Sequence, residues 1–238
     1  MVYGLIISAG NETRFASDTP KALSRINGVP LLTMNCNRLL KVCDSVLVIV
    51  SRKNKGFFGD YSTIEIDSGF GCGDAVWKAL KSLHFNEGDR CIVQWGDCFP
   101  SEEVYAKMIS CKDDYDVLIP AQYEESPYVE IEADGKGRAK KVLFSKYGET
   151  KGGKALHDLS VFCINPASAL GFMDSFHASK WDSERCCYSS KHGNEFQFLD
   201  LVNDTGINAK VMVVDGVRNI AFNTVQELDE IRKEYLNQ

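Results

Sequence analysis

The sequence of 238 residues lacks several features that would assign it to a common class of protein. No apolar run approaches the roughly twenty uninterrupted residues that a membrane-spanning helix needs, and the basic region and cleavage site of a secretory leader are missing. The nine cysteines include no Cys-x-x-Cys pair, their number is odd, and the chain is too long for a disulfide scaffold. We therefore expect a cytoplasmic protein with reduced thiols and no membrane partner.

Basic clusters and two common nucleotide-binding motifs are also absent. The net charge is -6 and no basic run is longer than Lys140-Lys141, which argues against a general nucleic-acid-binding protein. No Gly-x-x-x-x-Gly-Lys-Ser/Thr run exists, and the first turn carries only Gly10 where a dinucleotide-binding fold needs three glycines. An anionic ligand must therefore be bound by a few local side chains.

The hydrophobic pattern predicts an α/β fold with a mostly parallel sheet covered by helices. Strands are expected over 2–8, 45–50, 64–66, 90–95 and 116–120, with helices over 30–42 and 74–83 between them. The second half predicts a hairpin over 128–133 and 139–145, a mobile polar loop over 147–154 and a strand over 156–165. Helices over 166–177 and 195–202, a strand over 209–214 and a helix from Thr224 complete the expectation. A hydrophobic content of 44% suffices for one sizeable core, so a single domain is expected over 1–238.

The first predicted strand ends in a turn suited to a polyphosphate. Its apolar run reaches Ser8 and Ala9, passes through Gly10 and Asn11, and is followed by Arg14 and Lys21. Turn N–H groups can donate to phosphate oxygens, an arginine can fork across two of them, and a lysine adds a point charge. Taken alone, the same turn is equally compatible with a structural connection.

Two further segments carry chemistry at the expected ends of strands. Asp97 follows the strand over 90–95, where ligands collect in open parallel sheets, and its carboxylate suits Mg²⁺; capping of a helix after Pro100 is the alternative. A turn containing Gly71 and Gly73 would let the backbone approach a base or ribose closely. Asp74 beside it could instead simply cap the helix that follows.

These residues resemble the opening motif of nucleotidyltransferases that make activated sugars, choline and related head groups, a family with the MobA-like NTP transferase fold. The motif, Gly-x-Gly-Thr/Ser-Arg followed by Pro-Lys-x-Leu, is matched by Ala9, Gly10, Thr13, Arg14, Pro20, Lys21 and Leu23. Glu12 departs from it by standing where the family has a second glycine. The resemblance implies a Rossmann-like, GT-A type three-layer fold with an inserted β-hairpin subdomain, a nucleotide-binding half over 1–120 and an acceptor-binding half over 121–238.

The resemblance also implies site residues. Gly96-Asp97 matches the pair that holds the catalytic Mg²⁺, and Asn223 occupies the position of the second metal ligand, although Thr224 and Glu227 can also form a capping box there. Arg14, Lys21 and Asp97 are the implied catalytic residues. The implied nucleotide-binding residues are Ser8, Ala9, Gly10, Asn11, Gly71, Gly73 and Asp74.

Acceptor binding is implied for Lys146, Asp158 and Glu195, with Ser160 in place of a usual glycine; each match alone is equally compatible with a solvated lysine, a turn aspartate or a helix-start glutamate. The predicted reaction is attack of an acceptor phosphate on the α-phosphate of a nucleoside triphosphate, releasing pyrophosphate. A phosphate monoester is largely ionised near neutral pH and needs no general base, which agrees with the lack of a convincing catalytic histidine.

The short chain resembles small bacterial cytidylyltransferases, so CTP is favoured. Predicted acceptors are a sugar phosphate, phosphocholine or a phosphoglutamine-like compound, with a role in head-group, capsule or polysaccharide biosynthesis. A homodimer is compatible with this reading. Two alternatives stay open: a metal-dependent glycosyltransferase, although Asp97 is not part of an Asp-x-Asp, and a non-catalytic nucleotide-binding regulator.

Overall fold

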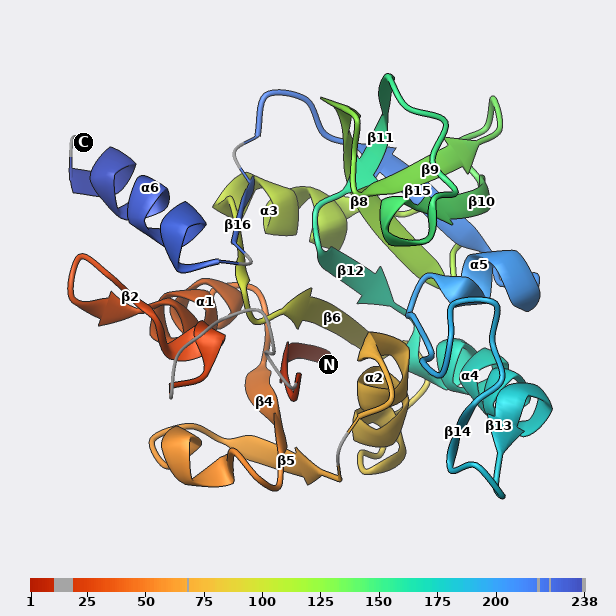
Figure 1. Cartoon of the computed structure of the whole chain (residues 1–238), viewed down its shortest axis with the longest axis horizontal. Helices are drawn as coiled ribbons and strands as arrows, with labels where there is room; N and C mark the ends of the chain where they lie inside the picture. The colour runs from red at the N-terminus through yellow and green to blue at the C-terminus, as the bar shows by residue number, and fades with distance from the viewer. Residues whose placement is uncertain (11–18, 68, 218, 223, 237–238) are drawn as a thin grey trace.

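The computed structural model describes residues 1–10, 19–67, 69–217, 219–222 and 224–236, and the statements below concern these residues. A central sheet crosses the molecule in the strand order β10-β9-β11-β8-β12-β6-β1-β4-β5, with β15 beside β8 (Figure 1). Its strands are β1 (Val2–Ser8), β4 (Ser45–Ser51), β5 (Thr63–Ile66), β6 (Arg90–Trp95), β8 (Val117–Glu125), β9 (Val129–Ala133), β10 (Ala139–Phe144), β11 (Lys154–Asp158), β12 (Val161–Ile164) and β15 (Ala209–Val213).

The sheet changes character along its width. Strands β5, β4, β1 and β6 are all parallel, as the periodicity of the first half predicts. Strand β12 runs antiparallel to both β6 and β8, and β11, β9 and β10 continue in antiparallel pairs, while β15 is parallel to β8. The predicted hairpin is confirmed as β9 and β10, and it extends the main sheet.

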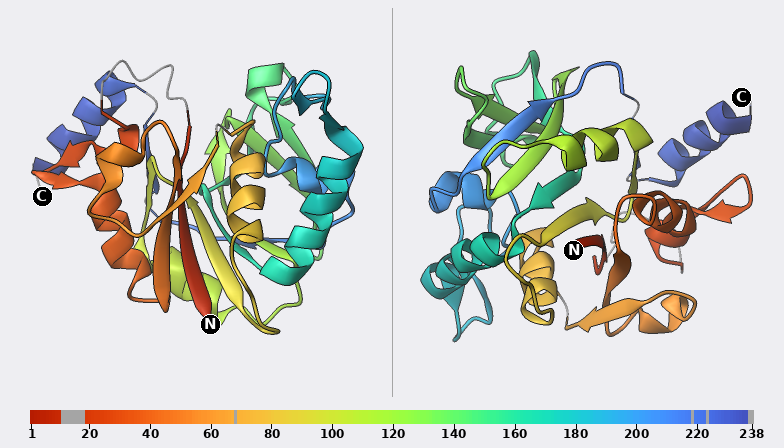
Figure 2. Two further views of the ribbon diagram at one scale, coloured as in Figure 1. Left: turned by 90° about the horizontal axis from the view of Figure 1, so that it is seen from below. Right: turned by 180° about the vertical axis from the view of Figure 1, so that it is seen from behind.

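Helices cover both faces of the sheet (Figure 2). Helices α1 (Leu31–Leu39) and α3 (Glu102–Ser110) pack on one face, and α2 (Cys72–Lys81), α4 (Pro166–Lys180) and α5 (Asp200–Asp204) pack on the other. Successive strand residues point to opposite faces, so Leu5 joins the core under α2 and α4 whereas Ile6 joins the core under α1 and α3. This three-layer arrangement confirms the predicted fold class.

The last helix, α6 (Val225–Leu236), lies beside the short β2 (Arg25–Ile26) and β3 (Val29–Pro30) pair. Thr224 and Glu227 exchange side-chain-to-backbone hydrogen bonds of 3.2 Å, so the capping box is present. The remaining short strands are β7 (Cys98–Pro100) with β16 (Asn219–Ala221), and β13 (Trp181–Asp182) with β14 (Cys187–Tyr188). Within the described ranges, every helix is too short or too polar to cross a membrane.

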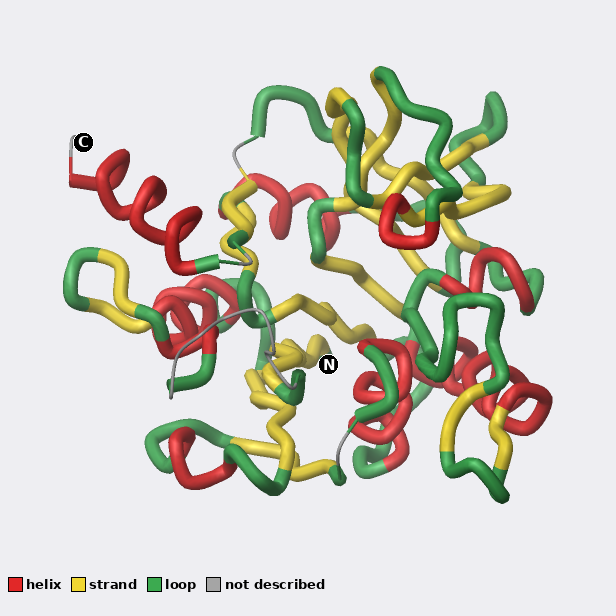
Figure 3. Tube along the Cα trace, viewed as in Figure 1, coloured by secondary structure: helices red, strands yellow, loops and turns green. Residues whose placement is uncertain are grey.

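Three element predictions were wrong in detail. The single strand expected over 156–165 is two strands, because the backbone turns at Ser160, whose φ is +58°. The helix expected over 195–202 begins only at Asp200, so Glu195 lies in a loop. Only the short α5 is helical in this part of the chain (Figure 3). Helix α2 begins at Cys72, which places Asp74 inside its first turn and not at the N-cap.

The polar segment over 147–154 was expected to be mobile, but several of its residues make specific contacts. A short helical turn, η3 (Ser145–Tyr147), begins the segment, and the Tyr147 ring stacks on His192. The carboxylate of Glu149 and the backbone of Lys151 also form hydrogen bonds. This loop is therefore attached to the protein at several points.

Candidate active site

The ends of β1 and β6 approach each other very closely. The N–H of Gly96 donates to the carbonyl of Ile7 over 2.9 Å. A Cβ atom at residue 96 would lie 2.4 Å from Ser8 Oγ and 3.0 Å from the Ile7 carbonyl, so a side chain there would force Ser8 or the backbone to shift. This close approach fixes the chain immediately before Asp97 and holds its carboxylate at the carboxyl edge of the parallel strands.

Lys21 and Asp97, 76 residues apart in sequence, meet at this edge. Lys21 begins the short helix η1 (Lys21–Leu23), and its Nζ lies 2.5 Å from Asp97 Oδ2. The lysine side chain is 11% exposed and the aspartate side chain 30% exposed, so the pair is only partly screened by water. The ring of Phe222 lies 5.6 Å from the same Nζ. The structure thus brings together two of the three predicted catalytic residues.

The remaining residues of the first turn fall partly outside the described residues. Ser8 and Ala9 are both 5% exposed, whereas Gly10 is exposed. Ser8 Oγ is buried with no hydrogen-bond partner in the part of the chain that the structure describes. The predicted residues Asn11, Arg14 and Asn223 lie outside the described residues, as does Glu12.

The chemistry at this edge fits a hard divalent cation. Asp97 is a partly exposed carboxylate, and Mg²⁺ is typically bound by one or two carboxylates together with phosphate oxygens and water. Among the described residues, no group of three or more His, Cys, Asp and Glu side chains could hold a metal ion. Burial raises the pKa of Cys98 well above its usual value, and this neutral thiol donates to Asp97 Oδ1 over 3.5 Å.

The glycine-rich turn packs against the protein's own chain. Gly71 has a φ of +100°, and a Cβ atom there would lie 2.4 Å from the Phe196 carbonyl oxygen. A Cβ atom at Gly73 would lie 2.7 Å from the Phe196 ring, and the Gly73 N–H donates to the Phe196 carbonyl over 2.9 Å. These contacts explain both glycines by packing. Whether they also contact a nucleotide stays a prediction.

Asp74 is buried and fully engaged at the start of α2. Its carboxylate accepts hydrogen bonds from Tyr188 Oη at 2.8 Å and from the Phe70 N–H at 3.1 Å, and it pairs with Lys78 Nζ at 2.7 Å. The side chain is 1% exposed. Asp74 therefore links α2 to the segment around β14. Its nucleotide contact stays a prediction.

The predicted acceptor residues come from three segments, and the structure pairs two of them. Lys146 Nζ lies 3.5 Å from Glu195 Oε2, which also accepts a 2.7 Å hydrogen bond from Gln197 Nε2. Asp158 is 4% exposed, and its Oδ1 accepts the Ser160 N–H over 2.8 Å. Burial raises the pKa of Asp158, although His157 and the Ser160 N–H oppose this effect.

Several carboxylates of the candidate site raise the pKa values of two buried cysteines. The carboxylates of Asp97 and Asp158 both raise the pKa of Cys98. Burial raises the pKa of Cys72 to about 12, and the carboxylates of Asp200, Glu195 and Asp158 add to that increase. Asp158 is therefore close enough to both cysteines to influence them.

One buried cluster was missed by sequence reasoning. The His192 ring lies between Asp200, whose Oδ1 is 2.5 Å from Nδ1, and Glu149, whose Oε2 is 3.1 Å from Nε2. The three residues are separated by up to 51 positions and carry no motif, so no local signal could have found them. The cluster adjoins the predicted acceptor residues, since Tyr147 follows Lys146 and stacks on His192.

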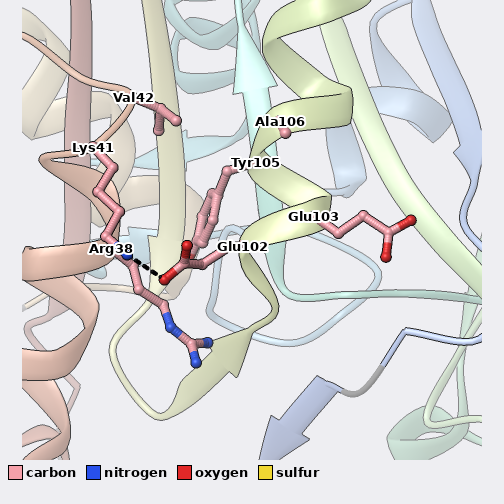
Figure 4. Close-up of a pocket in the computed structure, with 7 residues that line it drawn as sticks. All are labelled: Arg38, Lys41, Val42, Glu102, Glu103, Tyr105 and Ala106. Atoms are coloured by element: carbon pink, nitrogen blue, oxygen red, sulfur yellow. Dashed lines mark hydrogen bonds and ion pairs between the residues drawn. The ribbon is translucent and has the colours of Figure 1, made fainter.

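A separate pocket lies between α1 and α3 (Figure 4). It encloses about 290 Å³ and includes the Lys41–Glu102 ion pair, whose atoms are 2.5 Å apart. Arg38, which also lines it, stacks on Phe99 at 3.5 Å and donates to the Pro100 carbonyl. Of the predicted site residues that the structure describes, none lines this pocket, so it is not the candidate active site.

The fold is shared with solved structures of nucleotidyltransferases. The chain superposes on HddC from Yersinia pseudotuberculosis with a TM-score of 0.72 and 17% identity, covering 99% of this chain and 100% of that one. For the inositol-1-phosphate CTP transferase from T. maritima, the TM-score is 0.74, the identity 12% and the coverage 98% and 94%. For CTP:phosphocholine cytidylyltransferase (LicC) from Streptococcus pneumoniae, the values are 0.71, 15%, 98% and 98%. At these identities the likeness establishes the fold.

The sequence itself establishes the family. Residues 4–169 match the model of the MobA-like NTP transferase domain, which is more than half of the chain. The chain therefore belongs to the MobA-like NTP transferase family, as the opening motif predicts. It is also 30% identical over 152 residues to the bifunctional protein GlmU of Buchnera aphidicola subsp. Schizaphis graminum, covering 61% of this chain and 30% of that protein. The chain thus spans less than a third of that relative's length.

Proposed function

We propose that this chain is a Mg²⁺-dependent nucleotidyltransferase that joins the nucleotide of a nucleoside triphosphate, preferentially CTP, to a phosphorylated small molecule and releases pyrophosphate. The observation that carries the proposal is the Lys21–Asp97 pair at the carboxyl edge of β1 and β6. It supplies one cation and one carboxylate where a family of NTP transferases would place its triphosphate and metal.

Lys21 would stabilise the negative charge that grows on the α-phosphate as the acceptor oxygen attacks. A partly buried ammonium is effective there, because limited water screening strengthens its attraction for phosphate oxygens. Binding of the triphosphate would exchange the contact between Lys21 and Asp97 for contacts with the phosphates. Arg14 is proposed to steady the leaving pyrophosphate.

Asp97 would hold Mg²⁺, with Asn223 as the proposed second ligand. When bound, Mg²⁺ would neutralise charge shared by the α-phosphate and the attacking phosphate. Asp97 is suited to this role because it is fixed by Gly96 on one side and remains partly exposed. The Cys98 thiol orients the second carboxylate oxygen.

The base and the acceptor are proposals that rest on relatives. Two fold relatives have CTP in their printed names, and HddC was solved in complex with GMP-PN, so a guanine nucleotide is the competing choice. The acceptor would be a sugar phosphate, phosphocholine or phosphoglutamine-like compound that contacts Lys146, Asp158 and Glu195. A role in surface-polysaccharide or head-group synthesis follows from that chemistry.

The test is pyrophosphate release with Mg²⁺, each of the four ribonucleoside triphosphates, and a panel of glucose 1-phosphate, inositol 1-phosphate, phosphocholine and phosphoglutamine. We expect acceptor-dependent release with one triphosphate, lost in Lys21→Ala and in Asp97→Ala. Lys41→Ala is the matched control. It breaks the Lys41–Glu102 ion pair, which has the same 2.5 Å separation and lies in the pocket between α1 and α3. Triphosphate binding without release by any acceptor would favour the non-catalytic regulator.

A further inference from the structure

His192 is enclosed between two carboxylates from different parts of the chain. Its side chain is 0% exposed, with Asp200 Oδ1 at 2.5 Å from Nδ1 and Glu149 Oε2 at 3.1 Å from Nε2. Each ring nitrogen therefore has a carboxyl oxygen within hydrogen-bond distance, one from residue 200 and one from residue 149. Hydrogen bonds in which one partner is ionised are stronger than those between neutral groups.

The same ring is held by aromatic side chains from the segment that carries Lys146. Tyr147 stacks on it with a centroid separation of 4.6 Å and an interplanar angle of 23°, and Phe144 meets it edge-on at 4.7 Å. The Tyr147 hydroxyl also donates to the His192 carbonyl over 3.0 Å. Three residues of the 144–149 loop therefore contact His192 directly.

Glu149 closes this loop on itself and on the neighbouring segment. It accepts the Phe144 N–H over 3.1 Å and pairs with Lys191 Nζ at 3.1 Å. Although burial tends to raise the pKa of Glu149, the Phe144 N–H, Lys191 and His192 lower it below its usual value. The carboxylate form is therefore the one that fastens the loop.

The opposite side of the cluster shapes the segment that carries Glu195. Asp200 Oδ2 accepts the Gln197 N–H over 3.0 Å, and Ser190 Oγ donates to the Glu195 carbonyl over 2.8 Å. Lys146 and Glu195 are themselves about half exposed and 3.5 Å apart. An ion pair this exposed contributes little to stability, so it cannot hold the two segments together by itself.

We propose that His192 is a positioning residue that clamps the 144–149 loop onto the 190–200 segment, so that Lys146 and Glu195 face a phosphorylated acceptor together. This inference rests on the proposed function, since it assigns the clamp a role in acceptor binding. His192 does not touch the reacting phosphates in this scheme. Its loss should raise the acceptor KM about tenfold and change the triphosphate KM less than twofold.

Hydrogen exchange tests the clamp without any turnover. In His192→Gln, and separately in Glu149→Gln, we expect amide exchange over 144–151 to become at least tenfold faster, with β1 and β6 unchanged. His177→Gln is the matched control, because His177 also stacks on aromatic rings, at 4.1 Å from Trp77, but bonds to Tyr188 and not to the loop. Unchanged exchange over 144–151 in folded His192→Gln and Glu149→Gln would overturn the proposal.

Kinetics with the acceptor that gives the fastest pyrophosphate release tests the role in binding. The double variant His192→Gln/Glu149→Gln should raise the acceptor KM no more than His192→Gln alone, because both changes break one link. The inference would be overturned if the increases in acceptor KM of the two single variants multiplied in the double variant. Equal increases in the KM of acceptor and triphosphate would also overturn it. Failure of the proposed function is distinguishable, because the unmodified protein would then release no pyrophosphate with any acceptor.

Discussion

The edge around Lys21 and Asp97 and the cluster around His192 are built in opposite ways. Lys21 lies in a Pro-Lys-x-Leu run after β1, and Asp97 follows the end of β6. Parallel pairing of β1 with β6 brings these two local patterns together. The His192 cluster joins residues 149, 192 and 200, which lie in loops and at a helix start with no shared motif. The Lys21–Asp97 pair was thus readable from sequence, whereas the His192 cluster was not.

The largest expected effect is a different kinetic change in each region, with kcat affected at the Lys21–Asp97 edge and the acceptor KM affected beside the His192 cluster. Lys21→Ala should lower kcat by about 100-fold or more with every acceptor, because it removes charge stabilisation at the α-phosphate. Lys146→Ala should leave kcat nearly unchanged and raise the acceptor KM by about tenfold, consistent with loss of a charged contact to the acceptor. Steady-state kinetics decides the matter. Equal losses of kcat in both variants would remove the distinction between the regions.

A second prediction concerns the glycine-rich segment at the start of α2, which packs against Phe196. Gly73→Ala should destabilise the protein by about 1–3 kcal/mol, because the new methyl group would lie 2.7 Å from the Phe196 ring. Gly171→Ala is the control: it lies inside α4 with open space around it, so it should stabilise by about 0.5–1 kcal/mol. Urea denaturation measures both. A neutral Gly73→Ala would show that the packing is less demanding than the geometry implies.

The third prediction uses opposite pKa shifts at Asp158 and Asp134. Burial raises the pKa of Asp158, so its ionisation costs stability as the pH rises through the folded-state value. Asp158→Asn removes that cost while retaining an acceptor for the Ser160 N–H. It should therefore be more stable than the parent at pH 7, with the difference shrinking below about pH 4.

Asp134 provides the opposite sign in the same measurement. The Arg138 N–H, Lys140 and the Lys136 N–H lower the pKa of Asp134 to about 2, so its stabilisation is present above about pH 4 and lost towards pH 2. Asp134→Asn should accordingly be less stable at pH 7 and equal to the parent near pH 2. Unfolding followed across pH 2–7 checks both variants, and the same sign for both would contradict the assignment.

The smallest expected effect is at the turn between β11 and β12. Ser160 adopts a φ of +58°, which is costly for a side chain with a Cβ atom, so Ser160→Gly should stabilise by ~0.5–1 kcal/mol after the added flexibility of the unfolded chain is counted. Ser126→Gly, at a φ of +50° in another turn, should behave similarly. Thermal unfolding measures the change. A lower melting temperature in Ser160→Gly would show that the Ser160 hydroxyl outweighs the backbone strain.

Much of the fold could be predicted because periodicity is a local property. The strand over 90–95 was predicted with its observed bounds, and the β9–β10 hairpin was found from alternation around a glycine turn. The division of 156–165 into two strands was missed because no glycine or proline marks the turn and Val161–Ile164 resume a strand pattern at once. In the structure the turn is marked by the positive φ of Ser160, whose N–H donates to Asp158 Oδ1. The helix expected at Glu195 was wrong because that segment bonds to Phe70 and Gly73, far away in sequence.

The candidate site divides along the same line. Lys21 and Asp97 were predicted and are in contact, and Lys146 and Glu195 were predicted and lie 3.5 Å apart. The glycines at 71 and 73 pack against Phe196, a contact that the sequence did not indicate, and their nucleotide contact stays a prediction. His192 was set aside with the other histidines, because its carboxylate partners depend on the tertiary fold.

The most direct test of the central claim uses an acceptor whose phosphate carries ¹⁸O, with Mg²⁺ and the triphosphate that supports the fastest release. Mass spectrometry and ³¹P NMR would locate the label in the product. Attack by the acceptor phosphate on the α-phosphorus predicts ¹⁸O in the bridge between the two phosphates and unlabelled pyrophosphate, with no product from Lys21→Ala or Asp97→Ala. Free nucleoside monophosphate without a labelled bridge, formed equally by these variants, would contradict nucleotidyl transfer at the Lys21–Asp97 edge.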